Sequence, residues 1–155
     1  MLYFAYGSNM KFSQMKERCP SASFLCFAEL INHTLAFTRE STNRKCGVAD
    51  VIPCKKTSVW GVIYLINEVE LGALDKSEGF NPNREENAYI RKDVMVFGDG
   101  QIDQPFTAMT YVVQKKSDYH IPPSKDYLNL IISGAEMWHL PSEYIQKLLK
   151  IEVEG

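Results

Sequence analysis

Leu2-Tyr3-Phe4-Ala5-Tyr6-Gly7-Ser8-Asn9, at the start of the chain, joins an apolar run to a turn of small and polar residues. The apolar run predicts a buried strand over residues 2–6, and residues 13–18 have helical character. A strand that turns through Gly-Ser-Asn into a helix leaves backbone N–H groups pointing outward at the helix N-terminus. Such groups bind anions or a developing oxyanion without a charged side chain. Because Gly-Ser-Asn is also ordinary turn chemistry, this stretch alone does not define a site.

A second feature, far downstream, is a carboxyl group at the predicted end of a short helix. Asn67 and Glu70 have the spacing of an N-cap and its reciprocal carboxylate, so we expect a helix to begin near Val69. Gly79 suits the left-handed residue that ends a helix, which places Glu78 in the last helical turn. The negative end of the helix dipole and burial both raise the pKa of a carboxyl group there. Glu78 is therefore a candidate general acid/base, although an exposed surface glutamate is the commoner occupant of such a position.

Alternation of apolar and polar residues dominates the chain and predicts strands at residues 2–6, 23–29, 34–38, 48–52, 59–66, 88–97 and 106–113. In the last third, Ser124 is placed to cap one helix, and Pro141 suits the first turn of another. Many short strands with a few helices favour the α+β class over alternating βαβ units. Since no linker, repeat or low-complexity tract interrupts the pattern, we expect residues 1–155 to form a single domain.

Composition and charge argue against several functional classes. Of the 155 residues, 45% are hydrophobic and 23% are charged, which is enough apolar material for an independently folding core. The net charge is −2 and basic residues cluster only in pairs, so we expect neither a nucleic-acid partner nor a membrane surface. No apolar stretch approaches the roughly 20 residues of a spanning helix, and Met1 leads directly into the first predicted strand. We therefore expect the protein in the cytoplasm.

The cysteines and histidines show no metal-ligand spacing. No C-x-x-C pair occurs, and the histidines do not cluster with the cysteines, so we expect no metal site. In a cytosolic protein the thiols are expected to be reduced, and Cys26, between Leu25 and Phe27, reads as core filling. A catalytic Cys–His pair meets only in space, and no local sequence speaks for one. The residues concerned are Cys19, Cys26, Cys46, Cys54, His33, His120 and His139.

Several separated motifs occur in a fixed order along the chain. They are Tyr3-Phe4-Ala5-Tyr6-Gly7-Ser8-Asn9-Met10, Gly47-Val48-Ala49-Asp50, Val59-Trp60-Gly61-Val62-Ile63-Tyr64, Leu74-Asp75-Lys76-Ser77-Glu78-Gly79, Tyr89-Ile90-Arg91, Pro122-Pro123-Ser124-Lys125-Asp126-Tyr127, Gly134-Ala135 and Leu140-Pro141-Ser142-Glu143-Tyr144. Together they resemble the γ-glutamylcyclotransferase-like (AIG2-like) family, from Tyr3 to about Ile151. Several motifs in the correct order are far harder to obtain by chance than any one of them.

This resemblance implies a small, mixed, mostly antiparallel β-barrel flanked by helices, and an enzyme that needs no metal or organic cofactor. The family converts a γ-glutamyl amide into 5-oxoproline and a free amine, by attack of the substrate's own α-amine on its γ-carbonyl. Glu78 would be the catalytic acid/base, and the family suggests a homodimer. The resemblance also implies a substrate-binding set, with Tyr6 and Tyr127 favoured among the tyrosines. The set comprises Tyr3, Phe4, Ala5, Tyr6, Gly7, Ser8, Asn9, Tyr89, Tyr111 and Tyr127.

Two segments depart from the family pattern. Residues 79–88 form a longer link than is usual, which predicts either a lid over the pocket or an enlarged surface loop. Residues 39–45 have no firm counterpart. Within them, Arg39 or Arg44 is a candidate for bidentate contact with a substrate carboxylate, although solvated loop charges are commoner.

The substrate and the class of function stay open at this point. γ-Glutamyl amino acids are the first choice. Relatives acting on γ-glutamyl-lysine tend to carry Tyr-Gly-Thr-Leu in the first loop, and this chain departs from that motif at Ser8-Asn9. One alternative is a non-catalytic γ-glutamyl-binding or regulatory module on the same fold. Another is an acyl-transferring hydrolase that uses Cys or Ser. Ser8 lacks the G-x-S-x-G elbow of a nucleophilic serine, so we expect it to contact the substrate rather than attack it.

Overall fold

Five strands close into a barrel in the computed structural model, which describes residues 1–155. Their order around the barrel is β1-β3-β2-β4-β5. Strands β1 and β5 pair in parallel, and every other neighbouring pair is antiparallel, which confirms the expected mixed barrel. The strands are β1 (Leu2–Ala5), β2 (Ser23–Glu40), β3 (Gly47–Leu65), β4 (Tyr89–Gly98) and β5 (Pro105–Val113).

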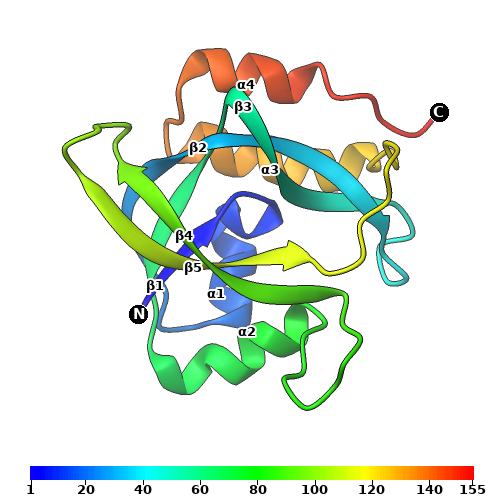
Figure 1. Ribbon diagram of the computed structural model, residues 1–155, viewed down its shortest axis with the longest axis horizontal. Helices are drawn as coiled ribbons and strands as arrows, with labels where there is room; N and C mark the ends of the chain where they lie inside the picture. Colours follow the sequence, from blue (N-terminus) through cyan, green and yellow to red (C-terminus); the bar gives the residue numbers. More distant parts are fainter.

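Helices pack around the barrel, which confirms the α+β class. In Figure 1, α3 and α4 lie together at the top of the view and α2 lies at the bottom, with the strands between them. The helical segments are the 3-10 turns η1 (Ser8–Met10) and η2 (Glu68–Glu70) and the helices α1 (Phe12–Arg18), α2 (Leu71–Ser77), α3 (Lys125–Met137) and α4 (Ser142–Leu149). None of these helices has the length and apolarity needed to cross a membrane.

The prediction of seven strands was wrong, because four of the predicted strands are halves of β2 and β3. These two long strands pair from Ser23 with Leu65 to Glu40 with Gly47. The register shifts at three bulges, one of them between Ile31 and His33. A bulge interrupts the alternation of apolar and polar residues but leaves the strands paired on both sides of it. The alternation of apolar and polar residues therefore predicted two separate strands where the structure has one strand with a bulge.

Most of the predicted helix ends are present. The side chain of Ser124 caps α3 by accepting from the Tyr127 amide at 3.1 Å, and Asn67 does the same for Val69 at 3.1 Å. Gly79 has a φ of +67°, the left-handed conformation expected after a helix. Glu78 is thus the C-cap residue of α2, one position beyond the last turn.

Two details of the predicted caps differ. The Glu70 carboxylate does not return to the Asn67 amide but accepts from the Ser21 amide at 2.8 Å. It therefore ties the start of α2 to the segment before β2 rather than completing a capping box. Pro141 stands immediately before α4 rather than inside its first turn.

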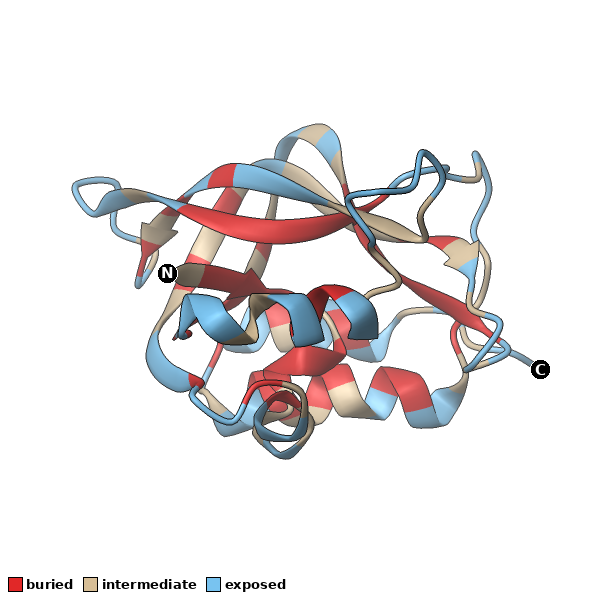
Figure 2. Cartoon of the chain, turned by 90° about the horizontal axis from the view of Figure 1, so that it is seen from below, coloured by how far each residue is buried: buried red, intermediate tan, exposed pale blue.

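The core fills the barrel and the space between the barrel and α3. Figure 2 shows buried residues along the strands and on the helix surfaces that face them. Fully buried side chains such as Phe4, Ile63 and Ile131 each contribute about 1.5–3 kcal/mol through removal of apolar surface from water. At Gly134, α3 lies so close to η1 that a Cβ would stand 2.4 Å from the carbonyl carbon of Met10. Glycine at this position therefore allows α3 to support the turn that follows β1.

We expect Gly134→Ala to lower the free energy of unfolding by about 1–3 kcal/mol, because the added methyl group meets backbone rather than a flexible side chain. Urea denaturation measures this. Gly72→Ala is the matched control: a Cβ added at this position of α2 would meet no neighbouring group within 4 Å, so the change should be neutral or stabilising. Equal stability of the Gly134→Ala variant and the wild type would contradict the tight contact.

Candidate active site

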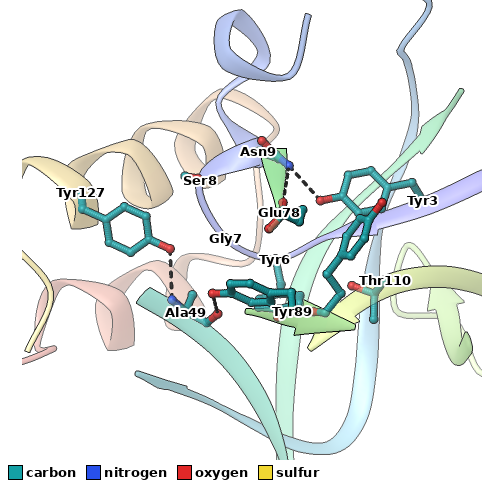
Figure 3. Close-up of a pocket in the computed structure, with 11 residues that line it drawn as sticks. Tyr3, Tyr6, Gly7, Ser8, Asn9, Ala49, Glu78, Tyr89, Thr110 and Tyr127 are labelled. Carbon is teal, nitrogen blue, oxygen red and sulfur yellow. Dashed lines mark hydrogen bonds between the residues drawn. The ribbon is translucent and has the colours of Figure 1, made fainter. Parts of the chain in front are cut away.

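The predicted site residues meet in a pocket of about 320 Å³ at the end of β1 (Figure 3). Strands β1, β3, β4 and β5, the turn after β1, the end of α2 and the start of α3 all contribute to it. Eight of the ten predicted binding residues line this pocket, together with Glu78. The lining residues are Tyr3, Tyr6, Gly7, Ser8, Asn9, Ala49, Glu78, Tyr89, Thr110, Tyr111 and Tyr127.

Phe4 and Ala5 are not among the residues that line the pocket, and their contact with a substrate stays a prediction. Successive side chains of a strand point to opposite faces, and Tyr3 occupies the pocket face. The Phe4 side chain is fully buried on the other face and packs over Gly61. Sequence reasoning missed Thr110 and Ala49. Ala49 lies in a family motif, whereas nothing in the sequence marks Thr110.

Glu78 is held at the pocket by the N-terminal turn. Its Oε1 accepts a hydrogen bond of 3.1 Å from Nδ2 of Asn9, and the same nitrogen donates to the Tyr3 hydroxyl at 2.9 Å (Figure 3). Arg18 Nη1 lies 3.8 Å from Oε1. Burial raises the pKa of Glu78 above its ordinary value, while the charges of Arg18 and Arg44 and the Asn9 hydrogen bond act in the opposite direction. The outcome is the upward shift expected of a general acid/base.

Asn9 positions this carboxylate through a fully used amide. Its Oδ1 accepts from Nε2 of Gln14 and from Nη1 of Arg18, both at 2.9 Å. Its Nδ2 makes the two bonds to Tyr3 and Glu78 described above. The sequence marked Asn9 as a turn residue, but its partners come from α1 and from the end of α2. Only the fold reveals its positioning role.

Two of the tyrosines offer a free hydroxyl proton to the pocket. The Tyr127 hydroxyl accepts from the Ala49 amide at 3.0 Å, and the Tyr3 hydroxyl accepts from Asn9. Neither hydroxyl donates to a protein group, so each can donate to a bound ligand. Burial raises the pKa of Tyr127 to about 12, which keeps it protonated at neutral pH.

The other three tyrosine hydroxyls are engaged within the protein. Tyr6 donates to the Tyr111 carbonyl at 2.5 Å and Tyr89 donates to the Ala49 carbonyl at 2.5 Å. Tyr111 donates to Asp75 at 2.6 Å, and Asp75 also accepts both bonds of an ion pair with Arg91. Their rings therefore wall the pocket while their hydroxyls brace it.

The turn after β1 supplies backbone donors. The Gly7 carbonyl accepts from the Met10 amide at 3.1 Å, which closes η1, whereas the Gly7 amide has no acceptor in the protein. The first N–H groups of η1 likewise have no acceptor within the turn. Ser8 accepts from Gln14 at 2.7 Å and is not paired with a histidine or lysine that would activate it as a nucleophile.

The comparisons with known proteins agree with this geometry. The model of the AIG2-like family matches residues 58–148, more than half of the chain. The chain belongs to the AIG2-like family. Human and bovine proteins named gamma-glutamylcyclotransferase are each 34% identical to it, over 97% of this chain and 78% of theirs. A solved structure named gamma-glutamyl cyclotransferase superposes with a TM-score of 0.88 at 32% identity, covering 99% of this chain and 89% of that one.

In this member of the AIG2-like family, a second space of about 610 Å³ adjoins the pocket, and we call it the vestibule. Ser8, Glu78, Tyr89 and Tyr127 line both spaces. The outer wall of the vestibule contains Arg18, Arg39 and Arg44, together with Ser41, Thr42 and Asn43. The candidate arginines of residues 39–45 thus lie beside the pocket, outside its inner part.

The long link after Glu78 is largely a surface loop in this structure. Only Gly79 and Ala88, at its two ends, line the vestibule. Hydrogen bonds fix the residues between these ends. Within the loop, Asn87 Oδ1 accepts from the Asn81 amide at 2.8 Å, and Gln114, which follows β5, donates to the Glu85 carbonyl at 2.8 Å. This arrangement favours the enlarged loop over the lid.

No group of three or more histidine, cysteine, aspartate or glutamate side chains is arranged to hold a metal ion. All four cysteines are free thiols, with Cys19 and Cys46 buried. Cys26 is only half-buried and packs against the core.

We expect Glu78→Gln to raise the free energy of unfolding at pH 7. The pKa of Glu78 is raised in the folded state, so the stability contributed by its neutral form is present at low pH and lost as the pH rises through the folded pKa. Glutamine removes that loss at pH 7, and the difference should shrink below about pH 4, where both states are protonated. Urea denaturation at pH 7 and at the lowest pH that keeps the protein folded measures this. A variant less stable than the wild type at pH 7 would contradict the burial argument.

Proposed function

We propose that the protein is a γ-glutamylcyclotransferase that releases 5-oxoproline and a free amine from a γ-glutamyl amide. The reaction is proposed because the relatives described above are named gamma-glutamylcyclotransferase. The observation that carries it to this chain is the largely buried Glu78 carboxylate, which faces a pocket with free tyrosine hydroxyls and backbone N–H groups. Retention of both Glu78 and the turn at Tyr6–Asn9 also speaks against a non-catalytic binding module.

The first step needs a base. The substrate's α-amine, with an ordinary pKa near 8, is mostly protonated at neutral pH and must lose a proton before it attacks. Glu78 takes this proton, and the amine nitrogen then bonds to the γ-carbonyl carbon. The carbonyl π electrons move to oxygen, and the resulting oxyanion is stabilised by the backbone N–H groups around Gly7 and Ser8. Return of the proton from Glu78 to the amide nitrogen lets the C–N bond break as the oxyanion re-forms the carbonyl. Glu78, ionised again, accepts the second proton from the ring nitrogen and passes it to the released amine, which leaves 5-oxoproline and the protonated amine.

Positioning of the substrate in the pocket also contributes to the rate of cyclisation. Closure of a five-membered ring requires a folded conformer of the glutamyl group, with the amine against its own γ-carbonyl. The rigid walls of the pocket, braced by the Tyr6, Tyr89 and Tyr111 hydrogen bonds, favour such a conformer. The hydroxyls of Tyr3 and Tyr127 are available for the α-carboxylate of the glutamyl group.

A cytoplasmic location and a homodimer stay predictions.

We expect Glu78→Gln to lower 5-oxoproline release by at least about 10³-fold, because glutamine keeps the shape and removes the proton acceptor. The measurement uses a small panel of γ-glutamyl dipeptides and amines with 5-oxoproline as the product. Glu86→Gln, an exposed glutamate of the loop, is the matched control and should retain full activity.

The possible results separate the candidate functions. Release that survives in Glu78→Gln would discard Glu78 as the base. Absence of release by the wild type, with a thermal shift on addition of the same compounds, would favour the binding module. Release of glutamate in place of 5-oxoproline, blocked by thiol or serine reagents, would point to the Cys or Ser hydrolase.

The acid limb of the pH profile of kcat/KM should report Glu78. Because the base acts only when ionised, activity rises with pH through the pKa of Glu78, which burial raises above its ordinary value. Arg18→Gln removes a charge that favours the ionised carboxylate, so its acid limb should move to higher pH. Arg84→Gln, an exposed arginine outside the site, should leave the limb unmoved. An acid limb that is unchanged in Arg18→Gln would show that another group controls it.

A further inference from the structure

A second buried carboxylate, Asp50, has no part in the reaction steps described above. It follows the pocket residue Ala49 on β3, and it is 0% exposed. Burial of a carboxylate is costly unless its charge is paired and its oxygens accept hydrogen bonds. Lys116 provides the opposite charge, with Nζ 2.6 Å from Oδ2, and 34% of the Lys116 side chain is exposed. The structure therefore keeps a paired charge directly beside a residue of the pocket wall.

The Asp50 side chain joins two strands that are not neighbours in the barrel. Strand β3 pairs with β1 and β2, whereas β5 pairs with β1 and β4. Oδ1 accepts from the Val51 amide at 2.9 Å and from the amide of Val113, the last residue of β5, at 3.1 Å. Oδ2 accepts from the Thr38 hydroxyl of β2 at 2.9 Å and from Lys116, which also donates to the Val113 carbonyl at 2.9 Å. Asp50 thus ties β3 to the strand that supplies two other residues of the pocket wall.

Ala49 connects this buried carboxylate to the pocket. Its amide donates to the Tyr127 hydroxyl at 3.0 Å, and its carbonyl accepts from the Tyr89 hydroxyl at 2.5 Å (Figure 3). Alanine has no polar side-chain atom, so the backbone alone makes both contacts. The carbonyl belongs to the planar peptide unit between Ala49 and Asp50, so a fixed Asp50 also fixes the direction of that carbonyl. The positions of both tyrosine hydroxyls therefore depend on the backbone at residues 49 and 50.

We propose that Asp50 is a positioning residue for the cyclisation, which holds Ala49 so that the Tyr127 hydroxyl presents its proton to the bound glutamyl group. This inference rests on the proposed cyclotransferase function and adds a residue to its machinery. Asp50 does not line the pocket, so it acts through the Ala49 backbone and not by contact with the reacting atoms. Lys116 serves the same purpose, because it balances the charge of Asp50 and binds the end of β5.

The test first compares Asp50→Ala with Asp50→Asn, each assayed where circular dichroism shows the native fold. Alanine accepts none of the four hydrogen bonds, whereas asparagine keeps one oxygen for the two backbone amides. We expect kcat/KM for 5-oxoproline release to fall about 100-fold in Asp50→Ala and about 10-fold in Asp50→Asn, the range for lost charge-assisted hydrogen bonds. Lys115→Gln, which changes the exposed neighbour of Lys116, is the matched control and should keep wild-type activity.

A double-mutant cycle then separates positioning from a general effect on the fold. Tyr127→Phe removes the hydroxyl through which Asp50 is proposed to act. The loss in the Asp50→Asn, Tyr127→Phe double variant should therefore be at least about 3-fold smaller than the product of the two single losses. Arg18→Gln acts through Glu78 instead, so its loss should multiply with that of Asp50→Asn. The cycle needs only Asp50→Asn, so it decides the question even where Asp50→Ala does not fold.

The outcomes distinguish failure of this inference from failure of the proposed function. Wild-type activity in folded Asp50→Ala or Asp50→Asn would overturn the positioning role and leave the cyclotransferase function intact. Losses that multiply in the cycle with Tyr127→Phe would assign Asp50 to the stability of the fold alone and would overturn it as well. A wild type that releases no 5-oxoproline from any γ-glutamyl compound of the panel would remove the proposed function itself, and this inference with it.

Discussion

The hydrogen bond between Asn9 and Glu78 joins the two parts of the chain on which the site depends. It connects the turn after β1 with the end of α2 over 69 positions of sequence, at 3.1 Å. Asn9 is held in turn by Gln14 and Arg18 from α1 and by the Tyr3 hydroxyl from β1. Because all four hydrogen-bonding positions of its amide are filled, the carboxylate it orients has little freedom. Glu78 thus faces the pocket in a geometry set by three separate elements.

The electrostatics of Glu78 balance two opposed effects. Burial disfavours the ionised carboxylate, whereas Arg18, Arg44 and Asn9 favour it, and burial is the largest single influence. A carboxylate paired more closely with arginine would bind its proton too weakly to return it to a leaving amine. One left wholly unpaired would stay neutral and accept no proton from the substrate. Arg18 Nη1, 3.8 Å from Oε1, provides a weaker influence than a direct bidentate ion pair.

Hydrogen-bond partners divide five tyrosines of one pocket into two groups. Tyr6, Tyr89 and Tyr111 donate their protons to protein acceptors and brace the walls. Tyr3 and Tyr127 accept from protein donors and keep their own protons available. Aromatic composition alone cannot make this distinction, because it depends on which backbone or side-chain groups the fold brings to each hydroxyl. The same argument separates Arg39, which is unengaged, from Arg18, which supports Glu78.

Local chemistry was enough to predict the strand and turn at residues 2–9, the caps at Asn67 and Ser124, and the left-handed Gly79, since each depends on neighbours within a few residues. Ordered motifs extended this to the barrel, to Glu78 and to eight of the pocket residues. The sequence did not predict that β2 and β3 continue through their bulges. The alternation of apolar and polar residues breaks at each bulge, but pairing with the distant strand continues on both sides of it. The motif did not show that Phe4 lies on the face of β1 away from the pocket, because a motif records neighbours in sequence and not the face of a strand. The contact of Asn9 with Glu78, the free hydroxyls of Tyr3 and Tyr127, and the position of Arg18 beside Glu78 were decided by the tertiary structure alone. Only closure of the barrel and packing of the helices bring those groups together.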